Sequence, residues 1–327
     1  MTTIRQIKQR GYMPNRLQIK LMMNGASNML KLLITFPGGI KKMREGQGHP
    51  TAKYKRYPRT YDLPKYEKGM KCQNSNEQYL RPTLYCDHTK PEVVALAHHL
   101  GAFKLSDKEY AENVFNFVKN NLHIEMVEFK DVDDTIIRGT GTCYHLISVF
   151  IALCRVAGIK ARYKLFAMDM IESFYDTLIG SDPMIKRWYD SMGYFMLEGE
   201  GEAYVDGEWV VAHVGPTPER QAGAGIPITT FGEDSIGNWF FAKPGTVMYR
   251  ESMPYGLNLM LKIGQKLAPG SMERFNLSIQ SQHEAGIKVL KDYDSLDAYD
   301  AVARKKQLSQ RPPEVNIKHK EQIVFEK

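Results

Sequence analysis

The sequence predicts an α+β fold in which helices pack on an antiparallel sheet. Residues 91–100 and 107–121 carry apolar side chains at helical spacing, and so does the stretch that begins at Cys143. Farther along the chain, Asp206-Gly207 separates two segments that alternate between apolar and polar residues, which is the signature of a two-residue β-hairpin. Helices grouped before antiparallel strands are typical of the α+β class.

Local signals predict the N-terminal elements. Residues 1–45 show weak helical periodicity that Pro37-Gly38-Gly39 ends. Residues 46–75 are rich in Gly, Pro, Lys and Tyr without periodicity, which predicts an extended arm packed on another surface. Before the second core helix, Ser106 and Glu109 are spaced for a capping box.

The elements around and after Cys143 follow in the same way. Residues 131–141 predict a polar loop that contains glycine, and Gly158 predicts the end of the Cys143 helix. The other expected elements are a strand over 160–168, a helix or an insertion over 170–188, strands over 194–204 and 208–214, a long loop after 216, helices over most of 254–308, and a loose charged tail over 312–327.

Charge is distributed unevenly along the chain. The formal net charge is +7, yet residues 1–66 hold 14 Lys and Arg against two acids, and the remaining 261 residues hold 30 against 35. Such a segment suits an acidic partner, namely an anionic membrane, a nucleic acid or an acidic carrier protein, although a solubilising tail explains the charge equally well. Bases alternate with tyrosines over residues 53–61, but no nucleic-acid motif accompanies them, so we do not expect nucleic-acid binding.

Composition and cysteine usage limit the classes of protein to which this chain can belong. With 43% hydrophobic and 25% charged residues, the composition is that of an ordinary globular protein. No uncharged apolar run predicts a transmembrane helix, and the N-terminus lacks a signal-peptide pattern. Cys72, Cys86, Cys143 and Cys154 have no CxxC spacing, which indicates free thiols and no zinc cluster. We therefore expect a cytoplasmic protein that needs no metal or organic cofactor.

The most specific chemical signal is Cys143. Residues 139–143, Gly-Thr-Gly-Thr-Cys, lead straight into the apolar helical pattern. A thiol at a helix start meets unsatisfied backbone N–H groups and the positive end of the helix dipole, which favour the thiolate. The sequence therefore predicts an activated nucleophile, with backbone N–H groups around it as an oxyanion hole. His145 is expected to point away from it, and no motif surrounds the remaining histidines outside the hairpin.

The hairpin supplies the candidate base. If Asp206-Gly207 is the turn, Glu200 lies opposite His213. One face then carries Glu198, Glu200, Glu202, Tyr204, Trp209, Val211 and His213. The acids are either a solvated edge or, in a cleft, groups that orient His213 as the base that a cysteine nucleophile requires.

Together these stretches resemble the transglutaminase-like superfamily, which shares its fold with papain-like cysteine peptidases. Residues 141–163 resemble the family's nucleophile helix and its "ALxRxxGIxARY" continuation, and residues 202–210 resemble its "EVYLDGxWV" hairpin. The likeness spans about residues 79–241, and residues 254–299 less specifically resemble the helical tail of prokaryotic relatives. It implies a papain-like core in which Cys143 attacks a carbonyl to give a thioester.

The resemblance also implies where the partners of Cys143 lie. The family's catalytic histidine precedes the hairpin glutamate by four residues, where this chain has Glu198, and its aspartate follows the hairpin tryptophan by four, where this chain has His213. The two residue types are exchanged. Three interpretations stay open: His213 is the base and Glu198 or Glu200 orients it; Glu198 acts directly on Cys143 or on substrate; or the protein is a catalytically inactive relative that binds.

The sequence therefore predicts cysteine-dependent acyl transfer on an amide, ester or carrier-bound thioester, with an amine or water as acceptor. The alternative is an inactive transglutaminase-like binding protein that uses its basic N-terminal arm. We expect a basic arm over residues 1–75, a transglutaminase-like core over 76–245, and a helical extension and tail over 246–327. By analogy with relatives that form amides from carrier-bound substrates, an acidic carrier protein would dock on residues 1–66, and the same charge is compatible with peripheral membrane contact. The oligomeric state is not defined by the sequence.

Overall fold

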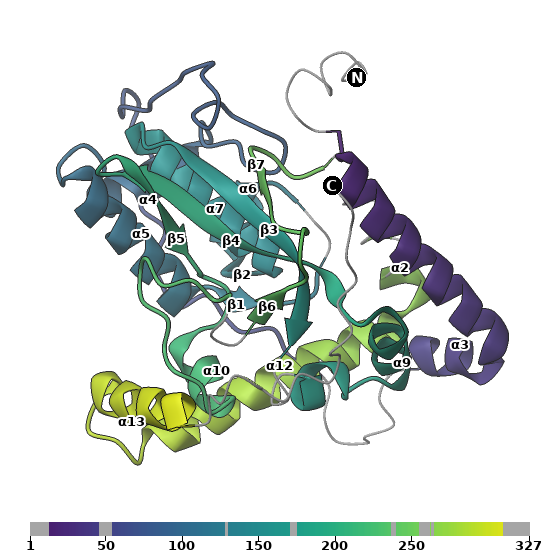
Figure 1. Ribbon diagram of the computed structural model, residues 1–327. Coiled ribbons are helices and arrows are strands. Elements are labelled where there is room, and N and C mark those ends of the chain that lie inside the picture. Colours follow the sequence, from purple (N-terminus) through teal and green to yellow (C-terminus); the bar gives the residue numbers. More distant parts are fainter. Residues whose placement is uncertain are drawn as a thin grey trace.

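The computed structural model describes residues 13–45, 54–127, 130–170, 175–236, 240–254, 262 and 265–309. Within them, helices surround a curled antiparallel sheet, which confirms the α+β class (Figure 1). The strands of this sheet are β3 (Ala161–Met170), β4 (Phe195–Val205), β5 (Glu208–Ala212), β6 (Phe240–Ala242) and β7 (Met248–Arg250). β4 lies between β5 and β3, and β6 and β7 pair with opposite parts of β3.

The predicted hairpin is confirmed, with its register. Asp206 and Gly207 have φ angles of 52° and 86°, so both central residues are left-handed, as a type I′ turn requires. Tyr204 pairs with Trp209, as expected for this turn. Counted outward from the turn, the last pair of β4 and β5 is Gly201 with Ala212. Glu200 and His213, which would form the next pair, lie just outside the paired region.

The helix α7 (Cys143–Ala157) packs against one face of the sheet and is almost wholly buried. Glycine on β4 makes this close approach feasible, because a Cβ at Gly201 would lie 2.6 Å from the Phe150 ring. Gly199 and Gly201 thus have a structural reason: both face α7, whereas Glu200 and Glu202 contact bases of β3. Gly158, with a φ angle of 91°, ends α7 as predicted.

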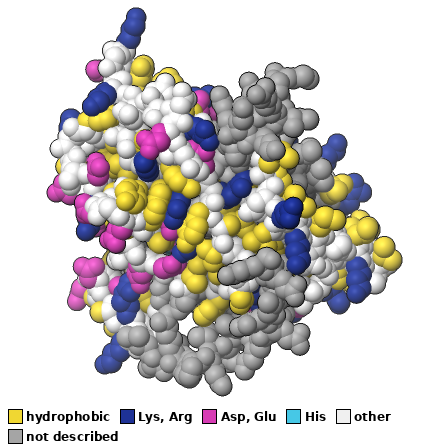
Figure 2. Space-filling view, turned by 45° about the horizontal axis from the view of Figure 1, so that its top comes forward, with side chains coloured by type: hydrophobic (Ala, Val, Ile, Leu, Met, Phe, Trp, Pro, Cys, Tyr) yellow, Lys and Arg dark blue, Asp and Glu magenta, His cyan; other side chains and the backbone are white. Residues whose placement is uncertain are grey.

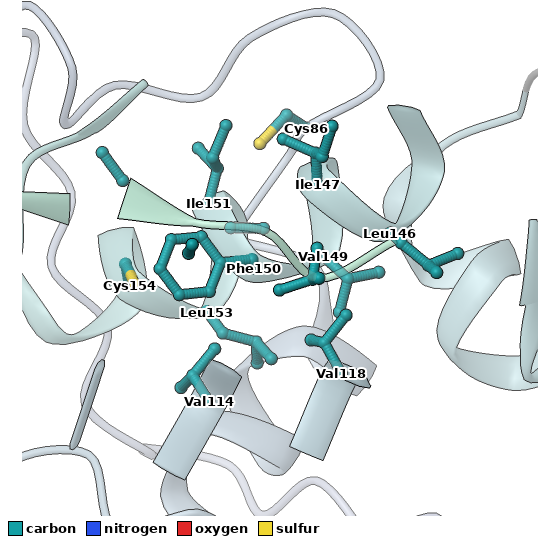
Figure 3. Close-up of a cluster of buried hydrophobic side chains, with 14 of the residues drawn as sticks. Cys86, Val114, Val118, Leu146, Ile147, Val149, Phe150, Ile151, Leu153 and Cys154 are labelled. Atoms are coloured by element: carbon teal, nitrogen blue, oxygen red, sulfur yellow. The ribbon is translucent and has the colours of Figure 1, made fainter. Parts of the chain in front are cut away.

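Two helices cover α7 on its other side. They are α4 (Pro91–His99) and α5 (Asp107–Asn121), and the Ser106–Glu109 capping box of α5 is confirmed. In the core that they form, Val114 and Val118 of α5 pack with Phe150 and Leu153 of α7 (Figure 3). This packing fixes the axis of α7, and with it the position of Cys143.

Two expected loops are wrong. Residues 131–141 form α6 (Val132–Arg138) and β2 (Thr140–Gly141), because Asp131 caps the helix and Gly139 ends it at a φ angle of 77°. β2 pairs in parallel with β1 (His123–Ile124).

The segment after Pro216 contains α10 (Pro218–Gly223), capped by Thr217. This short helix packs so closely on α12 (Pro269–Leu290) that a Cβ at Gly223 would lie 1.8 Å from the carbonyl oxygen of Gln282. The helix is therefore held by a tertiary contact that local periodicity does not reveal.

The N-terminal run is α2 (Arg16–Thr35), which ends before Pro37 as expected, but Pro37 then begins a second helix, α3 (Pro37–Arg44). Residues 54–75 contain no helix or strand, and Leu63 and Met70 pack on the core, as predicted for an arm.

The other elements are η1 (Tyr175–Ile179), α9 (Pro183–Met192) and α13 (Leu296–Ser309). The predicted tail over 312–327 and part of the predicted helical region, 255–261, lie outside the described residues. Among the described helices, none has the length and apolar character that crossing a bilayer requires. The three-part division of the chain stays a prediction.

Candidate active site

Cys143 is the first residue of α7, half-buried, and its sulfur is not in a disulfide. Thr142 is the N-cap, and its backbone N–H donates to Nδ1 of His145 at 2.9 Å. Burial lowers the pKa of His145 to about 3, so this ring is neutral. His145 therefore caps the start of α7, in keeping with the expectation that it is not the base.

The strand pair β1–β2 leads directly into Cys143. The Glu125 backbone N–H donates to the Gly141 carbonyl at 2.7 Å, and the Glu125 carboxylate accepts from the Thr140 hydroxyl at 2.5 Å. Nε of Arg56, from the arm, lies 2.9 Å from Oε2 of the same carboxylate. The basic arm thus contacts Glu125, which is hydrogen-bonded to β2 just before Cys143, and the sequence did not predict this contact.

A cluster of rings lies beside this strand pair. Tyr57 of the arm stacks on His123 of β1 with ring centroids 4.5 Å apart, and His283 of α12 lies 5.1 Å from both rings. The Nδ1 atom of His283 is 3.1 Å from the Thr217 hydroxyl. Burial, and then His283, lower the pKa of His123 to about 4. The sequence offered no motif around these histidines, because they come from distant segments.

His213 follows β5 and is 1% exposed. A Cβ at Gly215 would lie 3.8 Å from Nε2 of His213 and 3.6 Å from Cδ1 of Ile124. Since Ile124 is paired with Gly141, this edge of the imidazole lies near the strand pair that leads into Cys143. That the ring reaches the sulfur stays a prediction.

The other edge of the His213 ring faces a buried polar chain. Lys119 Nζ donates to Gln221 Oε1 at 2.7 Å, and the Thr229 backbone N–H donates to the same oxygen at 3.2 Å. Gln221 Nε2 is therefore a donor, and it donates to the Thr229 hydroxyl at 2.7 Å and to the Pro227 carbonyl at 3.1 Å.

This chain favours one tautomer of His213. The Thr229 hydroxyl oxygen already accepts, so its own proton needs an acceptor. Nδ1 of His213 lies 3.5 Å from this hydroxyl and can accept its proton. When Nδ1 of a neutral imidazole accepts, the ring proton sits on Nε2.

Electrostatics also keep His213 neutral. Burial lowers its pKa well below the ordinary value, and the cations of Lys119, Arg220 and Lys164 lower it further. Burial in turn lowers the pKa of Lys119 to about 7. The charged groups of the described residues that shift the His213 pKa are thus all cationic.

Glu200 and Glu202 of the hairpin pair with bases of β3. Glu200 Oε2 lies 3.0 Å from Lys164 Nζ, and Glu200 Oε1 accepts from the Ser235 backbone N–H at 2.9 Å. Glu202 Oε2 lies 2.6 Å from Arg162 Nε. Burial raises the pKa of Glu200, and Lys164 opposes that shift. These contacts favour a structural part for both carboxylates, and the expectation that Glu200 orients His213 stays a prediction.

Glu198 is placed only through its backbone, which pairs with Phe166 of β3. Its side chain lies outside the described residues. Its proposed role therefore rests on its sequence position alone.

Residues 94–212 match the model of the transglutaminase-like superfamily core. The chain contains a transglutaminase-like domain. The matched segment runs from α4 to the end of β5, so it includes Cys143 and both acids proposed from the hairpin, and it ends one residue before His213.

A solved structure from Cytophaga hutchinsonii, provisionally named a cysteine protease, is 16% identical to this chain. The match covers 52% of this chain and 49% of that one, with a TM-score of 0.32. The chain thus spans about half the length of that protein. Among curated proteins, no match was found.

Proposed function

We propose that this transglutaminase-like domain catalyses acyl transfer with Cys143 as the nucleophile. The supporting observation is the position of Cys143 as the first residue of a buried helix within the segment that matches the superfamily core. The thiolate attacks the carbonyl carbon of an amide, ester or thioester. The C–S bond forms as the amine, alcohol or thiol leaves with a proton, and an amine or water then breaks the thioester.

The geometry supports a specific part for His213. With its proton on Nε2, the neutral ring can donate a hydrogen bond to the Cys143 thiolate or to the oxyanion without losing that proton. The role of base would require the proton on Nδ1 and a turned Thr229 hydroxyl. The carboxylate of Glu198, at the family's histidine position, is then the proposed acceptor of the thiol proton.

Trapping the acyl-enzyme tests the proposal. The full chain is incubated with simple aryl esters and acyl thioesters, and its intact mass is measured after rapid acid quench. We expect an acyl adduct on the wild type that maps to Cys143 and is lost in Cys143→Ala. An adduct of equal yield on Cys143→Ala would contradict the proposal. The matched control is Cys72→Ala, which should keep the adduct.

One observation favours a second function, a binding protein without catalysis. Glu200 and Glu202 are bound in ion pairs with bases of β3, and the cations of Lys119, Arg220 and Lys164 lower the pKa of His213, so neither of these two carboxylates is set to stabilise an imidazolium. In that case no acyl adduct forms with any donor, and partner binding survives Cys143→Ala but fails when Lys41, Lys42 and Arg44 are neutralised together.

A further inference from the structure

The helices α2 and α3 stand at one edge of the molecule (Figure 1). α2 meets the body along one side, where Leu21 and Gly25 are buried. On that side Trp188 Nε1 donates to the Gly25 carbonyl at 2.8 Å, and Asn24 donates to the Tyr194 hydroxyl at 2.8 Å. The orientation of α2 is therefore fixed by packing and by hydrogen bonds.

The opposite side of α2 is apolar and exposed. Ile19, Met23, Leu30 and Ile34 are 43%, 67%, 60% and 73% exposed. At about 100° per residue, these four side chains fall within an arc of about 60°, so they form one stripe along a helix about 30 Å long. We call it the α2 stripe. Single exposed apolar residues are ordinary on protein surfaces, but a continuous row of four long ones marks an interaction face.

Basic residues flank the α2 stripe, and α2 itself carries no acid. Arg16, Lys20 and Lys31 lie beside it on the helix, and Lys41, Lys42 and Arg44 follow on α3; all six are exposed. The first acid of the chain is Glu45, which pairs with Lys41. In the space-filling view, yellow and dark blue side chains gather on the protruding right-hand edge of the molecule, where these helices lie (Figure 2).

We propose that the α2 stripe docks on an anionic lipid surface. The apolar row enters the boundary between headgroups and acyl chains, and the flanking bases contact the lipid phosphates and carboxylates, which is how amphipathic helices lie in a membrane interface. Charge decides against a second copy as the occupant, because two such faces would oppose cations with cations. An acidic protein would satisfy the bases, but a bare row of aliphatic side chains favours a hydrocarbon boundary.

Vesicle co-sedimentation of the full chain tests this. The probes are vesicles of phosphatidylcholine alone and of phosphatidylcholine with a minority of phosphatidylserine. We expect binding to the anionic vesicles, weakened about tenfold or more by the double variant Leu30→Ser/Ile34→Ser. Lys20→Gln/Lys31→Gln should weaken it by about tenfold or more, since each base near an anionic surface contributes about fivefold. The matched control is Ile287→Ser/Val302→Ser, which removes exposed apolar side chains from α12 and α13 and should change binding less than about twofold.

Several outcomes would overturn the proposal: no binding to anionic vesicles, equal weakening by the control variant, or a dimer of the wild type that Leu30→Ser/Ile34→Ser disrupts. Binding that depends on the lysines but not on Leu30 and Ile34 would reject insertion as well. Amide hydrogen exchange on the wild type requires no variant: vesicles should slow exchange in α2 and leave α13 unchanged, and unchanged α2 exchange would reject docking there.

Discussion

Oε2 of Glu200 lies 3.0 Å from Nζ of Lys164 on the neighbouring strand, and both side chains are buried. Arg162 and Glu202 repeat the pairing two residues away. Glu200 and Glu202 of β4 are therefore paired with bases of β3, which gives these two acids a structural reason without catalysis. This arrangement leaves His213 among cations and makes a neutral imidazole its resting form.

Glu200→Gln separates a structural carboxylate from one that orients His213. The variant removes one of the two carboxylates that contact Lys164 and leaves Asp234 on the same Nζ, so the lost charged hydrogen bond should lower the free energy of unfolding by about 2 kcal/mol. Urea denaturation measures this change. The pH profile of Cys143 alkylation should stay unchanged, and a shifted profile would instead support Glu200 as the residue that orients His213.

The reactivity of Cys143 can be compared with that of another thiol in the same chain. Cys72 is also half-buried, and burial followed by the charge of Asp87 raises its pKa. At neutral pH we expect iodoacetamide to label Cys143 at least about tenfold faster than Cys72, because the helix start favours the thiolate. Peptide mass spectrometry over time measures both rates in one sample. Equal rates would mean that the helix start does not activate the sulfur.

What the sequence could predict here is local. The ends of α7, the capping box at Ser106 and the turn at Asp206-Gly207 depend on residues within a few positions of one another, and each was predicted correctly. Cys143 was singled out for the same reason. The short helices α6 and α10 were missed, because a helix of one or two turns is stabilised by its tertiary contacts and not by its own periodicity.

The surroundings of the candidate site could not be predicted in this way. His213 follows β5, whereas the polar chain beside it comes from α5, α10 and the loop after α10 through Lys119, Gln221 and Thr229. No local pattern links these segments. From the sequence, Glu200 was expected to lie beside His213. Its contact with a base of β3 could not be foreseen, because the sequence did not define the register of β3 against β4.

Thr229→Val tests the tautomer of His213. Removing the hydroxyl removes the donor to Nδ1, so the ring proton can move to Nδ1 and expose the Nε2 lone pair. We expect the pH profile of Cys143 alkylation to change in Thr229→Val and to be restored in Thr229→Ser, which keeps the hydroxyl. ¹⁵N NMR of the His213 ring reports the tautomer directly. A wild-type spectrum with the proton on Nδ1 would contradict the assignment.

Lys119 should make stability depend on pH above neutrality. Its pKa falls from 10.5 in the unfolded chain to about 7 in the folded protein because of burial. Between these values the unfolded chain binds the extra proton, so folding releases it and stability rises with pH, by at most about 1.4 kcal/mol per pH unit. Below pH 7 the lysine is charged in both states, and the cost of burying that charge is fully present.

Lys119→Met removes this titration. Urea unfolding of the wild type and the variant at pH 7, 8 and 9 gives a difference in unfolding free energy that should grow in favour of the wild type as pH rises. The hydrogen bonds lost to Pro216 and Gln221 shift the variant by an amount that does not depend on pH. Lys108→Met, on the exposed side of the same helix, is the control and should run parallel to the wild type. If the Lys119→Met curve also ran parallel, Lys119 would keep its proton in the fold, and its charge would act on His213 throughout this pH range.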